Sequence, residues 1–252
     1  MSSSRVVSSV LPALQLARVQ SEVQRYLEES PHSSYFRDSP FTAWVSKLVN
    51  GSYGVSKRRT VISSEVEAFL PACKKLYYHY LPSVVSDLLG RDVFPLPIRG
   101  TMLVEVHCYQ EPGDTIGWHT DATKLGSAEH KVFTCVLCLE NSSTQKLCVT
   151  DEGGVRCYEM TPGDIFLFEH FSVCHATLPA LGEGEKRTIV TMVFAEHPYY
   201  DTLPAYVHDL AKNVSAYPLT EWFRYPAFQL NLLLVLLAVA ITAVATAAVL
   251  RL

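Results

Sequence analysis

Residues 108–122 read CYQEPGDTIGWHTDA, and this stretch decides the fold class and the candidate site together. A Gly-Asp pair predicts a turn, and the residues around Ile116–Asp121 predict a short strand after it. Alternate side chains of a strand point to the same face, so His119 and Asp121 present an imidazole and a carboxylate at one point. This pair forms the first part of a predicted metal site.

Short segments with strand character continue on both sides of this stretch. They are rich in β-branched and aromatic residues, and Gly, Pro, Asn and Asp separate them. Besides the piece already named they are Thr101–Tyr109, Lys131–Leu139, Lys146–Thr150, Val155–Glu159, Asp164–Phe168, His175–Leu178 and Thr188–Phe194. About eight strands at this spacing predict a jelly roll or a small barrel with helices packed outside.

A later strand supplies the predicted third ligand. His175 follows a Pro-Gly-Asp turn and a strand, and it opens the next strand. With His119 and Asp121 it would complete a triad of two histidines and one carboxylate, which holds Fe(II) and leaves coordination positions open. His170 follows the same turn and is the alternative ligand. Arg187 comes 12 residues after His175, and its guanidinium could bind a carboxylate through two parallel hydrogen bonds.

His119, Asp121, His175 and Arg187, in this order and on these strands, resemble the 2-oxoglutarate and Fe(II)-dependent dioxygenase superfamily over roughly residues 102–196. The resemblance implies that His119, Asp121 and His175 are the catalytic iron ligands. It also implies that Arg187 binds the far carboxylate of the co-substrate 2-oxoglutarate, helped by Tyr109. The spacing of 12 residues between His175 and Arg187 favours His175 over His170 as the third ligand. The other implied reactants are O2 and, as an accessory reductant, ascorbate.

Two subfamilies share features with this chain. The string from Asp114 to Asp121 is similar to that of the alkylated-nucleobase demethylases, but Val193-Phe194-Ala195 stands where those enzymes usually have a further arginine. The spacing of Arg187 and the helical region before the strands are closer to prolyl-hydroxylase-like members. We therefore expect oxidative hydroxylation of a protein side chain or of a lipid or other small molecule.

Two alternative functions stay open at this point. One is oxidative nucleic-acid demethylation, which the charge balance of 21 Lys and Arg against 25 Asp and Glu does not favour. The other is a non-catalytic, membrane-tethered binding module that keeps the fold. Intact candidates for each metal and co-substrate position argue against it.

The C-terminal segment predicts a membrane anchor. Residues 228–250 read FQLNLLLVLLAVAITAVATAAVL without a charged residue, and a helix of that length would run about 34 Å, enough to span the hydrocarbon core. We expect a single-pass tail anchor in the endoplasmic reticulum membrane, with the catalytic domain in the cytosol. Sequons at Asn50, Asn141 and Asn213 favour the opposite orientation.

The fold class predicted from these patterns is mainly β with flanking helices: a double-stranded β-helix (jelly-roll) core plus a C-terminal transmembrane helix. Residues 1–100 form a mainly helical support region, 101–197 the oxygenase core, 198–227 a connector and 228–250 the anchor. One helical stretch starts at Ser63-Ser64 and ends before Gly90. Lys57-Arg58-Arg59 is expected to be a solvated loop.

The cysteines predict no disulfide framework. There are seven, an odd number, without dense spacing, and in the cytosol they would stay reduced. Cys135 and Cys138 are three residues apart, so on a strand they would point to opposite faces. Cys108, Cys148, Cys157 and Cys174 are expected to be small buried apolar residues. His107 is expected to be packed or at the surface.

Overall fold

The computed structural model describes residues 4–8, 10–30, 35–37, 56–61, 63–96, 103–121, 131–151, 154–170, 172–197 and 236–237. No helix within these ranges has both the length and the apolar character needed to cross a membrane. The predicted anchor at 228–250 lies outside the described residues except for Leu236 and Leu237, and the predicted connector lies outside them entirely.

One large antiparallel sheet forms the body of the protein. Its strands are β1 (Ser4–Val7), β2 (Tyr35–Arg37), β3 (Ser56–Val61), β4 (Phe94–Pro95), β5 (Val104–Tyr109), β6 (Thr115–His119), β7 (Val132–Asn141), β8 (Lys146–Asp151), β9 (Gly154–Tyr158), β10 (Ile165–Glu169), β11 (Cys174–Leu178) and β12 (Arg187–Ala195). The hydrogen-bonded order is β1-β10-β7-β12-β5-β3-β6-β11-β8-β9, with β2 beside β3 and β4 beside β12.

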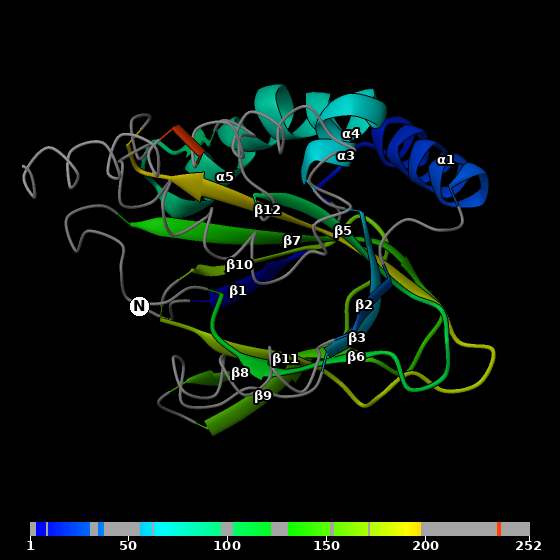
Figure 1. Ribbon diagram of the computed structural model, residues 1–252. Helices are drawn as coiled ribbons and strands as arrows, with labels where there is room; N and C mark the ends of the chain where they lie inside the picture. Colours follow the sequence, from blue (N-terminus) through cyan, green and yellow to red (C-terminus); the bar gives the residue numbers. More distant parts are fainter. Residues whose placement is uncertain are drawn as a thin grey trace, which may run out of the picture.

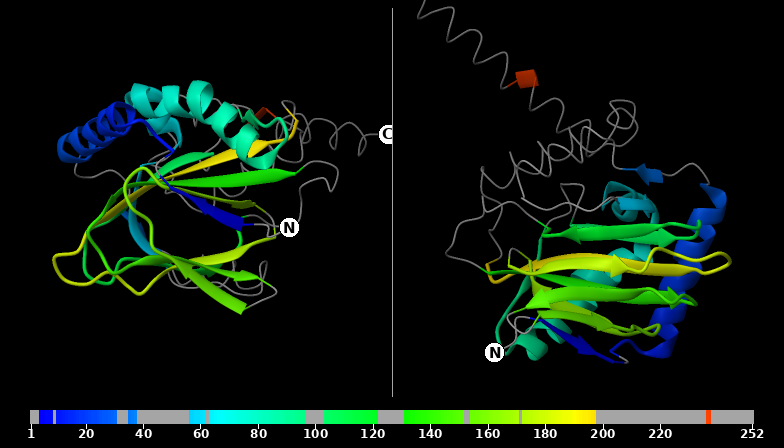
Figure 2. Two further views of the ribbon diagram at one scale, coloured as in Figure 1. Left: turned by 180° about the vertical axis from the view of Figure 1, so that it is seen from behind. Right: turned by 90° about the horizontal axis from the view of Figure 1, so that it is seen from below.

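The sheet folds over on itself, so that two layers face each other (Figures 1 and 2). One layer contains β1, β10, β7, β12 and β5, and the other contains β6, β11, β8 and β9. Strand β3 joins them, because it pairs with β5 and also with β6. This nearly closed, barrel-like arrangement confirms the predicted jelly-roll core.

Helices cover the outer face of the β7-β12-β5 layer (Figure 1). They are α1 (Ala13–Glu29), α3 (Ser63–Phe69), α4 (Pro71–Lys75), the π-helical turn η1 (Leu76–Tyr80) and α5 (Leu81–Leu89). Gly90 ends α5 with a left-handed φ of 65°, a conformation that glycine adopts without a steric penalty. The helical stretch expected to run from Ser63 to Leu89 is confirmed.

Alternation along the strands creates two apolar cores. Val104, Val106 and Cys108 of β5 belong to the core between the sheet and the helices, whereas Tyr109 belongs to the core inside the barrel. Cys135 and Cys138 of β7 divide in the same way, which confirms that they face opposite sides. Since alternate residues share a face, the polar side chains of β5 point into the barrel.

The N-terminal region contributes more to the sheet than expected. Strands β1, β2, β3 and β4 come from residues 1–100 and pair with the core strands or with each other. The prediction of a solvated loop at Lys57-Arg58-Arg59 is wrong, because these residues lie in β3 and Arg58 and Arg59 are buried. Arg59 donates a hydrogen bond from Nη2 to the Leu27 carbonyl at 2.9 Å, and a partner of this kind makes a buried cation tolerable.

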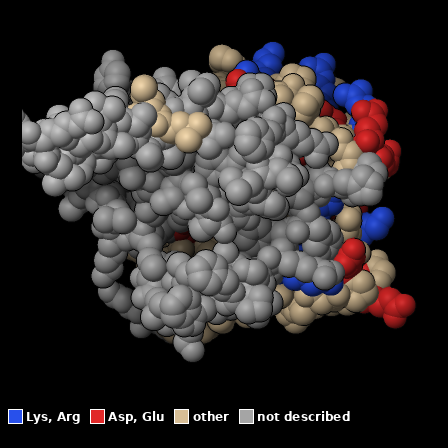
Figure 3. All heavy atoms as spheres, in the orientation of Figure 1, with Lys and Arg blue, Asp and Glu red and all other residues tan. Residues whose placement is uncertain are grey.

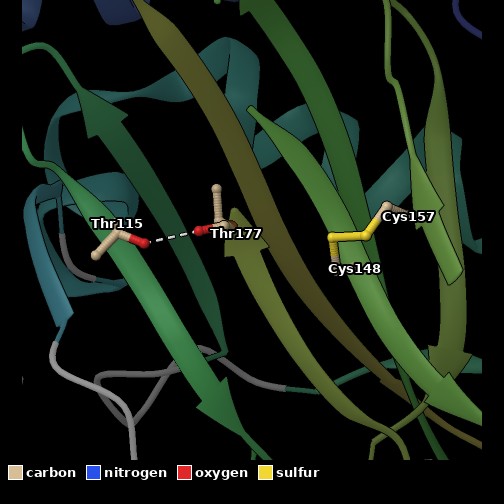
Figure 4. The surroundings of a disulfide bond; sticks show 4 residues. All are labelled: Thr115, Cys148, Cys157 and Thr177. Atoms are coloured by element: carbon tan, nitrogen blue, oxygen red, sulfur yellow. Dashed lines mark hydrogen bonds between the residues drawn. A yellow bond between two sulfur atoms is a disulfide. The ribbon is translucent and has the colours of Figure 1, made fainter. Parts of the chain in front are cut away.

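Two cysteines also differ from the expectation. Cys148 on β8 and Cys157 on β9 lie directly opposite in register and form a disulfide (Figure 4). The prediction that both are free apolar residues is wrong, since the sequence does not reveal that these two strands pair at this register. The other five, Cys73, Cys108, Cys135, Cys138 and Cys174, are free thiols.

Candidate metal and co-substrate site

The pairing of β6 with β11 brings two of the predicted ligands together. His119 and His175 are direct partners in the register of these strands, and their ring centroids lie 4.2 Å apart. Asp121 follows two residues after the end of β6. One ligand atom from each of His119, Asp121 and His175 can be chosen so that all lie within 4.8 Å of one another. The structure therefore assembles the predicted triad.

Asp121 lies between the two imidazoles. Its Oδ1 atom is 3.4 Å from Nε2 of His119 and 3.3 Å from Nε2 of His175. The opposite ring nitrogens face backbone carbonyls, since Nδ1 of His119 is 2.8 Å from the Gly117 oxygen and Nδ1 of His175 is 3.2 Å from the Val173 oxygen. A proton held on Nδ1 by such a carbonyl leaves Nε2 available as a metal ligand.

The charges of the triad are strongly coupled. Burial acts to raise the pKa of Asp121, but the neighbouring His175 and the hydrogen bonds from the surrounding imidazoles bring this pKa well below its usual range. Burial acts to lower the pKa of His175, but the Asp121 carboxylate outweighs burial and raises it. The pKa of His119 is lowered, chiefly by burial. Asp121 is therefore held as a carboxylate, the form that binds a metal cation.

His170, the alternative ligand, lies on the other side of the carboxylate. Its Nδ1 atom is 3.4 Å from Oδ2 of Asp121 and 2.7 Å from the hydroxyl of Thr134. The Thr134 hydroxyl in turn donates to Oδ2 of Asp121 at 3.0 Å. The group that can converge on one ion thus contains His175 and not His170.

Arg187 opens β12 inside the barrel, next to Tyr109 on β5. Its side chain is fully buried, and none of its three guanidinium nitrogens has a hydrogen-bond partner among the described residues. The guanidinium carbon lies 5.9 Å from the centre of the Tyr109 ring. The Tyr109 hydroxyl is likewise buried without a hydrogen bond of good geometry in the described part of the chain. Burial lowers the pKa of Arg187 and raises that of Tyr109.

These residues fit the cofactor and co-substrate that the motif implies. Two imidazoles and one carboxylate are the donor set of a mononuclear Fe(II) site with open positions. A buried guanidinium without a partner is costly, and a carboxylate is the group that its planar donors match. The barrel interior therefore offers a cation site and a separate anion site.

A buried polar network that was not predicted lies on the same inner wall. Arg58 donates from Nε to Nδ1 of His107 at 3.1 Å, and Nε2 of His107 lies 3.3 Å from the Thr191 hydroxyl and 3.5 Å from a Glu105 carboxylate oxygen. His107 was expected to be packed or at the surface, and the structure shows it packed and buried. The alternation of Glu105, His107 and Tyr109 along one strand is the signal that could have indicated a polar inner wall.

No protein-family model and no curated protein matches the chain. Among solved structures it is similar to the non-heme alpha ketoglutarate dependent epimerase SnoN from nogalamycin biosynthesis, with a TM-score of 0.55 and 15% identity over 80% of this chain and 85% of that one. It is also similar to a prolyl hydroxylase from Trichoplax adhaerens, solved with a peptide fragment of hypoxia inducible factor. The TM-score is 0.53, with 16% identity over 77% of this chain and 83% of that one. A third similar structure is an oxidoreductase of the 2OG-Fe(II) oxygenase family from Burkholderia pseudomallei, with a TM-score of 0.51 and 13% identity over 78% of this chain and 86% of that one.

At these identities the likeness concerns the fold. The chain has the fold found in 2-oxoglutarate and Fe(II)-dependent oxygenases, and the resemblance indicated by its motifs is confirmed at that level.

Proposed function

We propose that this protein is an Fe(II)- and 2-oxoglutarate-dependent dioxygenase that hydroxylates a C–H bond. One observation carries the proposal: three metal-ligand side chains converge inside a barrel that also buries an arginine without a hydrogen-bond partner among the described residues. A metal site alone would fit many functions. The added anion site fits a carboxylate co-substrate that binds beside the metal.

Each residue has a defined role in this proposal. His119, Asp121 and His175 hold Fe(II), and Arg187 with Tyr109 binds the far carboxylate of 2-oxoglutarate. When bound, Fe(II) and 2-oxoglutarate would supply the O2 activation and the oxidative decarboxylation that drive hydroxylation. The chain positions the reactants and excludes water. For example, the Phe168 ring packs 4.6 Å from the His175 ring, within the apolar inner core.

The substrate class that we propose is a protein side chain such as proline or lysine, with a lipid or small molecule as the alternative. The prolyl hydroxylase of similar fold was solved with a peptide, which supports a side chain. Nucleic acid is less well supported: on the face shown in Figure 3, described Lys and Arg side chains are interspersed with Asp and Glu rather than gathered in one basic patch. Extended phosphate binding requires such a patch.

We further propose that residues 228–250 anchor the protein in the endoplasmic reticulum membrane with the catalytic domain in the cytosol. The support is the uncharged apolar sequence of the segment. The Cys148–Cys157 disulfide favours a lumenal domain as the second candidate, because disulfides persist in oxidising compartments. The sequons at Asn50, Asn141 and Asn213 favour the same alternative.

The test of activity is O2-dependent succinate formation. The full-length chain is loaded anaerobically with Fe(II) and 2-oxoglutarate, then exposed to O2 with proline- or lysine-containing peptides or with lipid vesicles. We expect succinate and a product heavier by one oxygen atom. Absence of succinate with every substrate class, from protein that has bound both Fe(II) and 2-oxoglutarate, would favour the non-catalytic binding module.

Protease protection on intact microsomes tests the orientation. A cytosolic domain is digested without detergent and carries no glycan. Resistance of residues 1–225 until detergent is added, or a glycan on any of the three sequon asparagines, would show that the domain is lumenal.

A further inference from the structure

The two oxygens of the Asp121 carboxylate have different surroundings. Oδ1 faces the imidazoles of His119 and His175. Oδ2 accepts a hydrogen bond from Thr134 and lies 3.4 Å from Nδ1 of His170. One oxygen thus points to the candidate metal position, and the other points to a pair of hydrogen-bond donors.

These donors are themselves fixed in place. Thr134 lies on β7 and is buried, and the backbone N–H of His170 donates to the Val132 carbonyl at 2.9 Å. The Thr134 oxygen is 2.7 Å from Nδ1 of His170. If the Thr134 proton is given to Oδ2, this short contact requires a proton on Nδ1 of His170. The order of donation then runs from His170 to Thr134 to Asp121.

We propose that Thr134 and His170 are positioning residues that reserve Oδ1 of Asp121 for the metal. This inference rests on the proposed function of the triad. Asp121 follows the end of β6, so the strand ladder alone does not fix its side chain. Turning the carboxylate to offer both oxygens to one ion would break the hydrogen bond from Thr134 to Oδ2. This hydrogen bond therefore favours coordination through Oδ1 alone, which leaves coordination positions open for co-substrate and O2. Hydrogen bonds that orient ligands in this way commonly strengthen metal binding by about 10- to 100-fold.

The test compares isosteric variants in the full-length chain. Thr134→Val removes the hydroxyl and keeps the shape, whereas Thr134→Ser keeps the hydroxyl. His170→Leu removes the donor, whereas His170→Asn keeps an amide N–H near the position of Nδ1. Thr115→Val is the matched control, because Thr115 also donates a hydrogen bond, at 2.7 Å to the Thr177 carbonyl (Figure 4), but does not touch Asp121.

Two measurements are made anaerobically without turnover. The first is the dissociation constant of Co(II) as an Fe(II) substitute, and the second is the ligand-field absorption spectrum of bound Co(II), which responds to the number of carboxylate oxygens on the ion. We expect Thr134→Val and His170→Leu to weaken Co(II) by about 10-fold or more and to change the spectrum. Thr134→Ser, His170→Asn and Thr115→Val should stay within about 3-fold of the native protein with the native spectrum.

The outcomes distinguish failure of the positioning role from failure of the proposed function. Native Co(II) affinity and spectrum in Thr134→Val and His170→Leu would overturn the positioning role and leave the proposed function intact. An equal loss in Thr115→Val would also overturn it, since the effect would then be general destabilisation. Failure of the native chain to bind Co(II) or Fe(II) would instead overturn the proposed function. Thermal unfolding of the metal-free variants identifies any that do not fold.

Discussion

At the metal end of the candidate site, Asp121 contacts two imidazoles and a hydroxyl, whereas at the other end the Arg187 guanidinium has no hydrogen-bond partner among the described residues. Both ends lie inside the same barrel, where His175 and Arg187 are buried and His119 and Asp121 are partly exposed. The metal end balances its charges within the chain. The Arg187 end leaves a buried cation without a hydrogen-bond partner among the described residues, which a bound anion would balance under the proposed function.

This difference predicts how each end responds to mutation. Because the triad is already held together by contacts between its members, removing one member removes both a metal ligand and a native interaction. Among the residues that the structure describes, the Arg187 side chain makes no such interaction beyond its contact with the Tyr109 ring. Its removal should therefore impair ligand binding without impairing the fold.

Asp121→Ala should produce the largest loss. Fe(II) binding should weaken by more than about 100-fold, a larger effect than that of neighbours which only orient a ligand, and His119→Ala and His175→Ala should behave alike. Anaerobic equilibrium dialysis with metal analysis measures this. His170→Ala should have a smaller effect, so retention of iron in His175→Ala with its loss in His170→Ala would show that the third ligand is assigned incorrectly.

Arg187→Leu should separate binding from stability. The affinity for 2-oxoglutarate should fall by about 30-fold or more, since loss of one partner of a buried charge pair costs about 2–5 kcal/mol, while Fe(II) stays bound. The free energy of unfolding without ligand should rise by about 1 kcal/mol, because an uncompensated buried charge is removed. Arg187→Lys should lose less affinity. Calorimetric titration and urea unfolding test both parts, and unchanged 2-oxoglutarate affinity in Arg187→Leu would remove Arg187 from the site.

Reduction of the Cys148–Cys157 disulfide should affect neither end. A cross-link that closes so short a loop is worth about 2 kcal/mol, so reduction should lower the free energy of unfolding and leave Fe(II) and 2-oxoglutarate affinities unchanged. Thiol titration of the denatured, unreduced protein should find five free thiols if the disulfide persists, which are the cysteines outside the pair; that result would favour the lumenal alternative. Seven thiols in protein isolated from its native compartment would contradict the disulfide and support the proposed cytosolic domain.

A rise in pH should have opposite effects on two properties of the metal end. It should lower the contribution of His175 to the stability of the metal-free protein, and it should raise the affinity for Fe(II). In the metal-free protein the pKa of His175 is raised, so its contribution to stability is full below the unfolded pKa of about 6.5. That contribution is lost as pH rises through the folded pKa. Metal must displace this proton, so Fe(II) affinity should rise over the same interval, by up to about 10-fold per pH unit. Urea unfolding and Fe(II) titrations over this pH interval test the prediction. If the contribution of His175 to stability and the Fe(II) affinity both rose with pH, the coupling between His175 protonation and metal binding would be contradicted.

Much of the fold follows from local sequence patterns. The strand segments after residue 100 lie within a few residues of their predicted bounds because their side chains alternate and turn residues separate them. The strands of the N-terminal region were not predicted. Their pairing is decided by contacts with strands far along the chain, as when β1 joins β10, and no local pattern encodes such a partner.

The candidate site was predictable for a different reason. His119 and Asp121 are close in sequence, and the family motif supplies His175 and Arg187. Thr134 and His170 carry no motif, because their role depends on the neighbouring positions of β7 and β10. The Cys148–Cys157 pair likewise depends on the register of β8 against β9. Residues that act through another side chain become visible only once the strands are placed.

The most direct test of the central claim is an anaerobic titration of the full-length chain with Fe(II), followed by 2-oxoglutarate. We predict one Fe(II) per chain, and 2-oxoglutarate binding that requires the metal, is lost in Asp121→Ala and is strongly weakened in Arg187→Leu. A native chain that binds no Fe(II), or that binds 2-oxoglutarate equally well without metal and without Arg187, would contradict the account.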